Sequence, residues 1–169
     1  LEGTNIKLAD TRKTTPGLRI FEKYAFKCGG GVNHRMGLYD AAMIKENHIA
    51  WTDNLNNAVK KIRLNSPFTT HIIIEAENIE QAKEAVLAGA DSVLLDEFSP
   101  EIIKKNVQEL RDLSMNSLKK EVNKNLIIEV SGINPEEISK YLIKGIDLIS
   151  TSSSITKSNW IDLSMRYIN

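Results

Sequence analysis

The fold is decided by the stretch HIIIEAENIEQAKEAVLAGADSVLLD, residues 71–96. It begins with three consecutive β-branched isoleucines, which are typical of a parallel strand covered on both faces. Asn78 followed by Gln81 three residues later is a capping-box arrangement that indicates a helix start, and Gly89 indicates the helix end. A second apolar run then leads to Asp96. The stretch therefore predicts one strand–helix–strand unit.

The same order of elements recurs along the chain. Residues Glu136–Thr151 repeat the pattern of Ile79–Asp96, with a glycine at the helix end and an aspartate two residues later. Such a succession implies a parallel sheet with right-handed crossovers. The G-x-G-x-x-G fingerprint of dinucleotide-binding sheets is absent after the strands. We therefore predict an α/β barrel, with an open doubly wound sheet as the alternative. The expected strands are Ile6–Ala9, Ala42–Lys45, His71–Ala76, Ser92–Leu95, Leu126–Val130 and Asp147–Ser150.

Other helix ends are also readable in the sequence. Proline suits the first turn of a helix, and glycine commonly ends one. We expect helices from Pro16 to about Lys27, from a Thr52 cap to about Leu64, from Ser99-Pro100 onward with a break near Ser114, and from Asn134-Pro135 to Gly145.

Composition and charge limit the classes of function. The 169 residues are 41% apolar and 26% charged, which is the profile of one globular domain with a hydrophobic core. Acidic and basic residues balance at 22 each, so we expect neither nucleic acid nor a membrane surface as a partner. The single Cys28 excludes an internal disulfide and indicates a reducing cytoplasm. The sequence contains neither a long apolar run nor a signal-peptide pattern.

Polar side chains follow every expected strand. In α/β barrels the carboxyl ends of the strands carry the site, and the last two loops often hold phosphate. Arginine and lysine bind carboxylates and phosphates, glutamate and aspartate are hard oxygen ligands for Mg²⁺, and serine–glycine turns offer N–H groups to phosphate. This order predicts a ligand with several anionic groups and a divalent metal. The residues concerned are Asp10, Arg12 and Lys13, then Lys45 and His48, then Glu75 and Glu77, then Asp96, then Ser131 and Gly132, and finally Thr151–Ser154.

Each of these groups has a plainer interpretation when taken alone. Arg12-Lys13 can be a solvated pair after a strand, and Glu75 and Glu77 can be the acidic charges common near helix N-termini. The serine-rich run can be an ordinary loop. Only the coincidence of all of them on one predicted face favours a site.

The segment Asp10–Asn47 is far more specific than these separate signals. It contains DTRKTTPGLR (10–19), EKYA (22–25), GGG (29–31), NHR (33–35), GL (37–38), Asp40 and IKENH (44–48). This run strongly resembles the quinolinate phosphoribosyltransferases, also called nicotinate-nucleotide pyrophosphorylases (carboxylating). The resemblance continues through EAEN (75–78), AGAD (88–91), LLD (94–96) and EVSG (129–132).

The resemblance implies a fold, a reaction and partners. The fold is an incomplete α/β barrel, and residues 1–169 correspond to the catalytic barrel domain without the family's N-terminal domain. The reaction joins quinolinate to phosphoribosyl pyrophosphate with Mg²⁺, and releases pyrophosphate and CO₂ to leave nicotinate mononucleotide for NAD synthesis. Family sites form across a homodimer, where the partner's N-terminal domain contributes an arginine. A chain without that domain is expected to bind quinolinate poorly.

The resemblance also implies roles for individual residues. Arg12, His34 and Arg35 are expected to hold the quinolinate carboxylates, while Lys13 and Lys45 add positive charge around both substrates. Glu75 and Asp96 are expected on the metal and ribose–pyrophosphate side, so that Lys13, Lys45, Glu75 and Asp96 form the expected catalytic set. The expected phosphate loops contain Ser131, Gly132, Ser152, Ser153 and Lys157.

The phosphate loops depart from the family pattern. The family usually has two glycines where this chain has only Gly132, and Lys157 replaces a histidine. Two alternatives follow. The chain could be a paralogous barrel acting on another substrate, such as the molybdate-operon homologue, although intact Arg12, His34 and Arg35 favour a dicarboxylate. It could also be a non-catalytic phosphate-binding or oligomerisation module.

Overall fold

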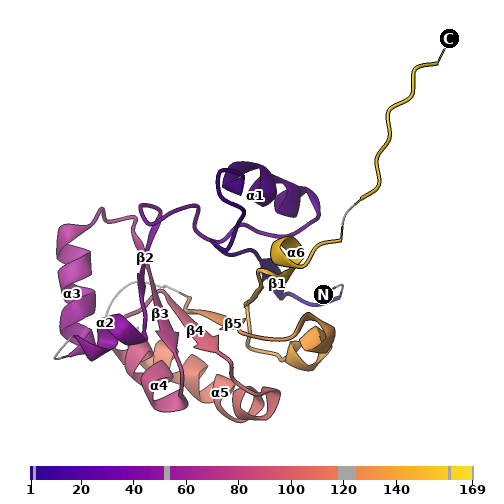
Figure 1. Cartoon of the computed structure of the whole chain (residues 1–169). Helices are drawn as coiled ribbons and strands as arrows, with labels where there is room; N and C mark the ends of the chain where they lie inside the picture. Colours follow the sequence, from indigo (N-terminus) through magenta and orange to yellow (C-terminus); the bar gives the residue numbers. More distant parts are fainter. Residues whose placement is uncertain (2, 52–53, 118–124, 160, 169) are drawn as a thin grey trace.

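The six expected strands form one parallel sheet. The computed structural model describes residues 1, 3–51, 54–117, 125–159 and 161–168. The strand order is β1-β6-β5-β4-β3-β2, and every neighbouring pair in this order is parallel. The two ends of the order, β1 and β2, leave the sheet open, so the predicted α/β fold is confirmed as an incomplete barrel (Figure 1). The strands are β1 Lys7–Ala9, β2 Ala41–Ile44, β3 His71–Ala76, β4 Ser92–Asp96, β5 Ile127–Ser131 and β6 Leu148–Ser150.

Helices connect the strands, and the main ones pack on the outer face of the sheet. Helices α3, α4 and α5 lie along one side of the sheet, whereas α1 lies near β1 and α6 (Figure 1). In the described ranges, no helix combines the length and the apolar character needed to cross a bilayer. The helices are α1 Arg19–Cys28, α2 Glu46–Ala50, α3 Leu55–Asn65, α4 Ile79–Leu87, α5 Pro100–Ser117, the 3₁₀ helix η2 Pro135–Tyr141 and α6 Ser153–Thr156.

Three predicted helix features are wrong. The first helix begins at Arg19 rather than Pro16, because Gly17 adopts a φ of +79° that a right-handed helix does not contain. Helix α5 continues through Ser114, whose side chain is buried, instead of breaking there. The segment after Asn134 is a short 3₁₀ helix that ends at Tyr141, well before Gly145.

Two predicted helix caps have different outcomes. The predicted Thr52 cap lies outside the described residues, and the observed cap of α3 is Asn54, whose side chain accepts from the Asn56 and Asn57 N–H groups. Asn78 caps α4 as expected, since its side chain accepts from the Gln81 N–H. Gln81 itself accepts from the Glu77 N–H rather than from that of Asn78.

Alternation along the strands separates the core from the site. Because successive side chains of a strand point to opposite faces, Ile72 and Ile74 pack into the main core beneath the helices, whereas Ile73 faces the barrel interior. Ile73, Leu94, Ala41 and partly buried Met43 form a small apolar cluster there. The strand residues two positions beyond Ile73 and Leu94 therefore also face the interior.

Candidate active site

A cavity of about 480 Å³ opens at the carboxyl ends of the strands. The predicted site residues line it, apart from His48, Ser154 and Lys157, which are exposed outside the lining. Lys157 directly follows α6, and its predicted role remains untested. Glu77 also lies outside the cavity lining and is exposed. The gathering of strand ends at one place is therefore confirmed. The lining includes Arg12, Lys13, His34, Arg35, Met43, Lys45, Glu75, Leu94, Asp96, Glu129, Ser131, Gly132, Ser152 and Ser153.

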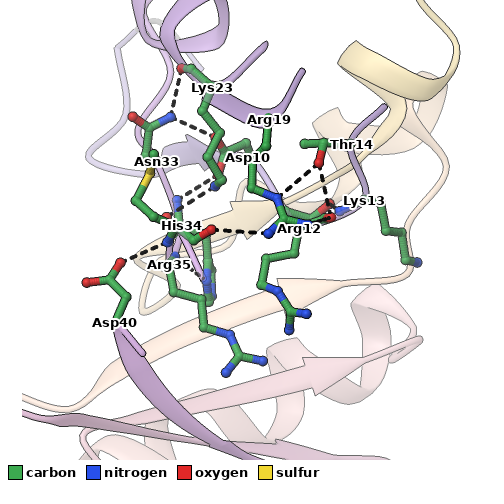
Figure 2. Close-up of polar contacts among 12 residues, drawn as sticks. Asp10, Arg12, Lys13, Thr14, Arg19, Lys23, Asn33, His34, Arg35 and Asp40 are labelled. Atoms are coloured by element: carbon green, nitrogen blue, oxygen red, sulfur yellow. Dashed lines mark hydrogen bonds and ion pairs between the residues drawn. The ribbon is translucent and has the colours of Figure 1, made fainter. Parts of the chain in front are cut away.

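Two arginines form one wall of the cavity. The guanidinium groups of Arg12 and Arg35 extend in the same direction from neighbouring loops, whereas Lys13 extends away from them (Figure 2). One nitrogen of Arg35 donates to the Ala41 carbonyl over 3.0 Å, and Arg12 Nε is buried without a hydrogen-bond partner. Burial lowers the pKa of Arg35, and repulsion from Arg12 lowers it further. An anionic ligand would relieve this repulsion.

His34 lies between the arginine wall and a buried carboxylate. The ring Nδ1 accepts from the Arg35 backbone N–H over 2.8 Å, so the ring proton belongs on Nε2. Nε2 lies 3.2 Å from Glu129 Oε2 and can donate to it. Both ring nitrogens are thus engaged, and His34 can donate to a ligand carboxylate only if Nε2 leaves Glu129.

Two carboxylates, Glu75 and Asp96, also line the cavity. Lys45 Nζ donates to Glu75 Oε2 over 2.6 Å, and Ser131 Oγ donates to Asp96 Oδ1 over 2.5 Å. Burial raises the pKa of the Glu75 carboxyl. The contact with Lys45 opposes this increase, and the charge of Asp96 adds to it. Glu75 and Asp96 are therefore close enough to repel each other, which a cation between them would offset.

Glu129 is a charged cavity residue that was not among the predicted site residues. It lies within β5, two residues before the strand end at Ser131, and its side chain is 1% exposed. Its Oε1 atom is buried without a hydrogen-bond partner. The signal was present in the sequence, because an acidic residue inside an apolar strand is rare unless it has a partner.

The loop after β5 is shaped by Gly132. Its φ is +71°, and it lies against Glu97, whose own φ of 57° is unusual for a residue with a side chain. A Cβ atom at Gly132 would lie 2.5 Å from Glu97 Cγ and 3.0 Å from the Glu97 backbone nitrogen. Only glycine fits this turn between two cavity loops.

We expect Gly132→Ala to destabilise the protein more than a matched change at Gly89. Gly89 also has a positive φ of +85°, but a Cβ there would meet nothing within 4 Å. Gly89→Ala should cost about 1–2 kcal/mol for the backbone conformation alone. Gly132→Ala should add about 1–3 kcal/mol for overpacking. Urea unfolding of both variants measures the difference, and equal losses would show that Glu97 does not restrict this position.

The fold and the cavity define an α/β-barrel protein with a highly charged cavity at the carboxyl ends of its strands. Its lining combines arginines, lysines, carboxylates, hydroxyl groups and the Gly132 loop. The family described as quinolinate phosphoribosyl transferase, C-terminal domain, matches residues 1–166. The chain therefore belongs to the family of quinolinate phosphoribosyltransferase C-terminal domains.

Individual relatives agree with this assignment. The chain is 42% identical over 161 residues to a probable nicotinate-nucleotide pyrophosphorylase [carboxylating] of Methanothermobacter thermautotrophicus, which covers 95% of this chain and 55% of the relative. A relative with the same description from Bacillus subtilis is 39% identical, over 98% of this chain and 53% of its own length. The chain thus spans about half the length of the curated relatives it matches.

A solved structure shares the fold. The crystal structure of NadC from Streptococcus pyogenes superposes with a TM-score of 0.82 at 38% identity. The match covers 96% of this chain and 53% of that chain.

Proposed function

We propose that this chain is the catalytic barrel of a nicotinate-nucleotide pyrophosphorylase (carboxylating). In this proposal quinolinate and phosphoribosyl pyrophosphate react to form nicotinate mononucleotide, pyrophosphate and CO₂, as a step of NAD biosynthesis. The curated relatives carry this activity in their names. The observation that carries the proposal is the cavity, whose lining brings two arginines and two carboxylates together with apolar Met43 and Leu94.

The cavity suits the chemistry of the proposed reaction. A pyridine ring can rest on Met43 and Leu94 while its two carboxylates face Arg12 and Arg35. Positive charge that develops at the ribose would be stabilised by a carboxylate such as Glu75, and the departing pyrophosphate by the lysines. After bond formation, a cationic wall also favours the charge left on the ring when CO₂ departs. The reaction needs no covalent nucleophile, so the site acts mainly by orientation and electrostatics.

We propose Glu75 and Asp96 as the protein ligands of Mg²⁺. Mg²⁺ commonly takes one or two carboxylates from a protein and completes its shell with water and substrate phosphates. The described residues contain no group of three or more His, Cys, Asp or Glu side chains arranged to hold a metal by themselves. The residues present therefore fit an ion that arrives with pyrophosphate, to which it would supply charge neutralisation.

We also propose that the whole enzyme works as a homodimer in the cytoplasm. Helix α1 and the following loop carry large apolar side chains on the surface, and extended patches of this kind are typical of protein interfaces. The single Cys28 suits a reducing compartment. The exposed side chains are Ile20 (74%), Phe21 (71%), Tyr24 (70%), Leu38 (72%) and Tyr39 (89%).

The proposed function is tested by product formation. The chain is mixed with quinolinate, phosphoribosyl pyrophosphate and Mg²⁺, and nicotinate mononucleotide is measured by chromatography, with nicotinate as a parallel substrate. The same assay uses the full-length protein that contains this chain. Product from quinolinate but not from nicotinate supports the proposal. No product from the full-length protein would overturn it and leave a non-catalytic binding module or a paralogue.

A further inference from the structure

A fully buried ion pair lies behind the arginine wall. Asp10 directly follows β1 and Lys23 lies on α1, and the side chains of both are 0% exposed. Lys23 Nζ donates to Asp10 Oδ1 over 2.5 Å and to the His34 carbonyl over 3.2 Å. Buried charges of this kind are retained only when they are paired and hydrogen-bonded. Neither residue has a role in the proposed chemistry.

Two further donors complete the pair. Asn33 Nδ2 donates to Asp10 Oδ2 over 2.7 Å and to the Lys23 carbonyl over 2.9 Å. The His34 backbone N–H donates to Asp10 Oδ1 over 2.8 Å. Figure 2 shows Asp10 at the centre, between Lys23, Asn33 and His34. One carboxylate therefore joins β1, α1 and the loop that carries His34 and Arg35.

Because the sheet is open, the loops that follow β1 and α1 depend on contacts such as those of Asp10 with Lys23, Asn33 and His34. In the described chain, β1 and β2 stand at opposite ends of the strand order and do not pair. The segment between them is tied to β1 by a single bridge, Ala9 to Val32. The cationic pair Arg12-Lys13 begins two residues after Asp10, and the pair His34-Arg35 directly follows Asn33. The strand ladder does not reach these loops, so their relative placement depends on side-chain contacts. These are the Asp10 cluster and Arg19, which donates to the Arg12 and Met36 carbonyls.

We propose that Asp10, Lys23 and Asn33 are positioning residues that set the spacing of Arg12 and Arg35 for a dicarboxylate. This inference rests on the proposed function and deepens it. The cluster holds two loops in register, so its loss changes the fit of the ligand with two carboxylates more than that of the phosphorylated substrate. A misplacement of about 1 Å can cost about a hundredfold in rate.

The test uses the full-length protein with Asp10→Asn, Lys23→Met, the double variant and Asn33→Ala. Lys83→Met is the matched control, because Lys83 also loses an ion pair, with Glu109 on the outer helices. In the folded variants we expect the KM for quinolinate to rise about tenfold or more and that for phosphoribosyl pyrophosphate by less than about threefold. Hydrogen exchange at the His34 amide should become faster. Lys83→Met should change neither the two KM values nor the exchange at the His34 amide.

The outcomes separate positioning from folding. The single charge removals leave an uncompensated buried charge and can fail to fold, whereas the double variant and Asn33→Ala leave none. The proposal would be overturned by folded variants whose KM values equal those of the unmodified protein while kcat is lower. It would also be overturned if hydrogen exchange at the His34 amide is the same as in the unmodified protein. If the unmodified protein makes no product, the proposed function fails. Calorimetric binding of quinolinate to the same variants then decides the positioning role, and affinities equal to that of the unmodified protein overturn it.

Discussion

Arg35→Ala is expected to raise the KM for quinolinate by about a hundredfold. The loss of a charge-assisted bidentate pair in a partly buried site costs about 3 kcal/mol, which corresponds to about a hundredfold in affinity. The Arg35 guanidinium is held at β2, where one of its nitrogens donates to the Ala41 carbonyl. Steady-state kinetics with each substrate varied in turn measures the effect.

Two companion variants sharpen this prediction. Arg35→Lys keeps the charge but loses the planar fork, so its KM should lie between those of the unmodified protein and Arg35→Ala. Arg166→Ala removes an exposed arginine outside the cavity lining and should leave the KM unchanged. A rise of less than about threefold in Arg35→Ala would mean that the dicarboxylate does not bind at this wall.

The sheet was predictable because its signals are local. Residues 71–96 contain a β-branched strand, a capped helix and a glycine stop, and all three lie within a few residues of the expected positions. One error, at Ser114, occurs where the backbone conformation depends on packing rather than on local sequence. Burial of Ser114 keeps α5 continuous, although serine is common at helix ends. Sequence periodicity carries no such information.

The site was predictable at the strand ends and less so elsewhere. Parallel strands bring their carboxyl ends to one edge, so Glu75, Asp96 and Ser131 could be grouped without coordinates. Glu129 lies inside a strand, whereas the prediction considered only residues at and after the strand ends. Lys23 reads as a surface residue of a helix, and its complete burial requires Asp10 and Asn33 to arrive from other parts of the chain. Long-range charge pairing of this kind leaves no spacing signal.

Glu75→Gln is expected to lower kcat by about a hundredfold to a thousandfold while the protein stays at least as stable. Removing one preorganised charge that faces the developing transition-state charge typically costs this much. The expected change in stability has the opposite sign. Because burial raises the pKa of the Glu75 carboxyl despite its contact with Lys45, the ionised group disfavours the folded state at neutral pH. A neutral glutamine of the same shape does not carry that cost.

The combination of lower turnover and unchanged or higher stability distinguishes a catalytic carboxylate from a structural one. Glu77→Gln is the matched control, because Glu77 follows the same strand but is exposed outside the cavity lining. It should keep both kcat and the thermal midpoint. Parallel loss of midpoint and kcat in Glu75→Gln would instead show that Glu75 holds Lys45 and the strand end together. An unchanged kcat would remove Glu75 from the proposed chemistry.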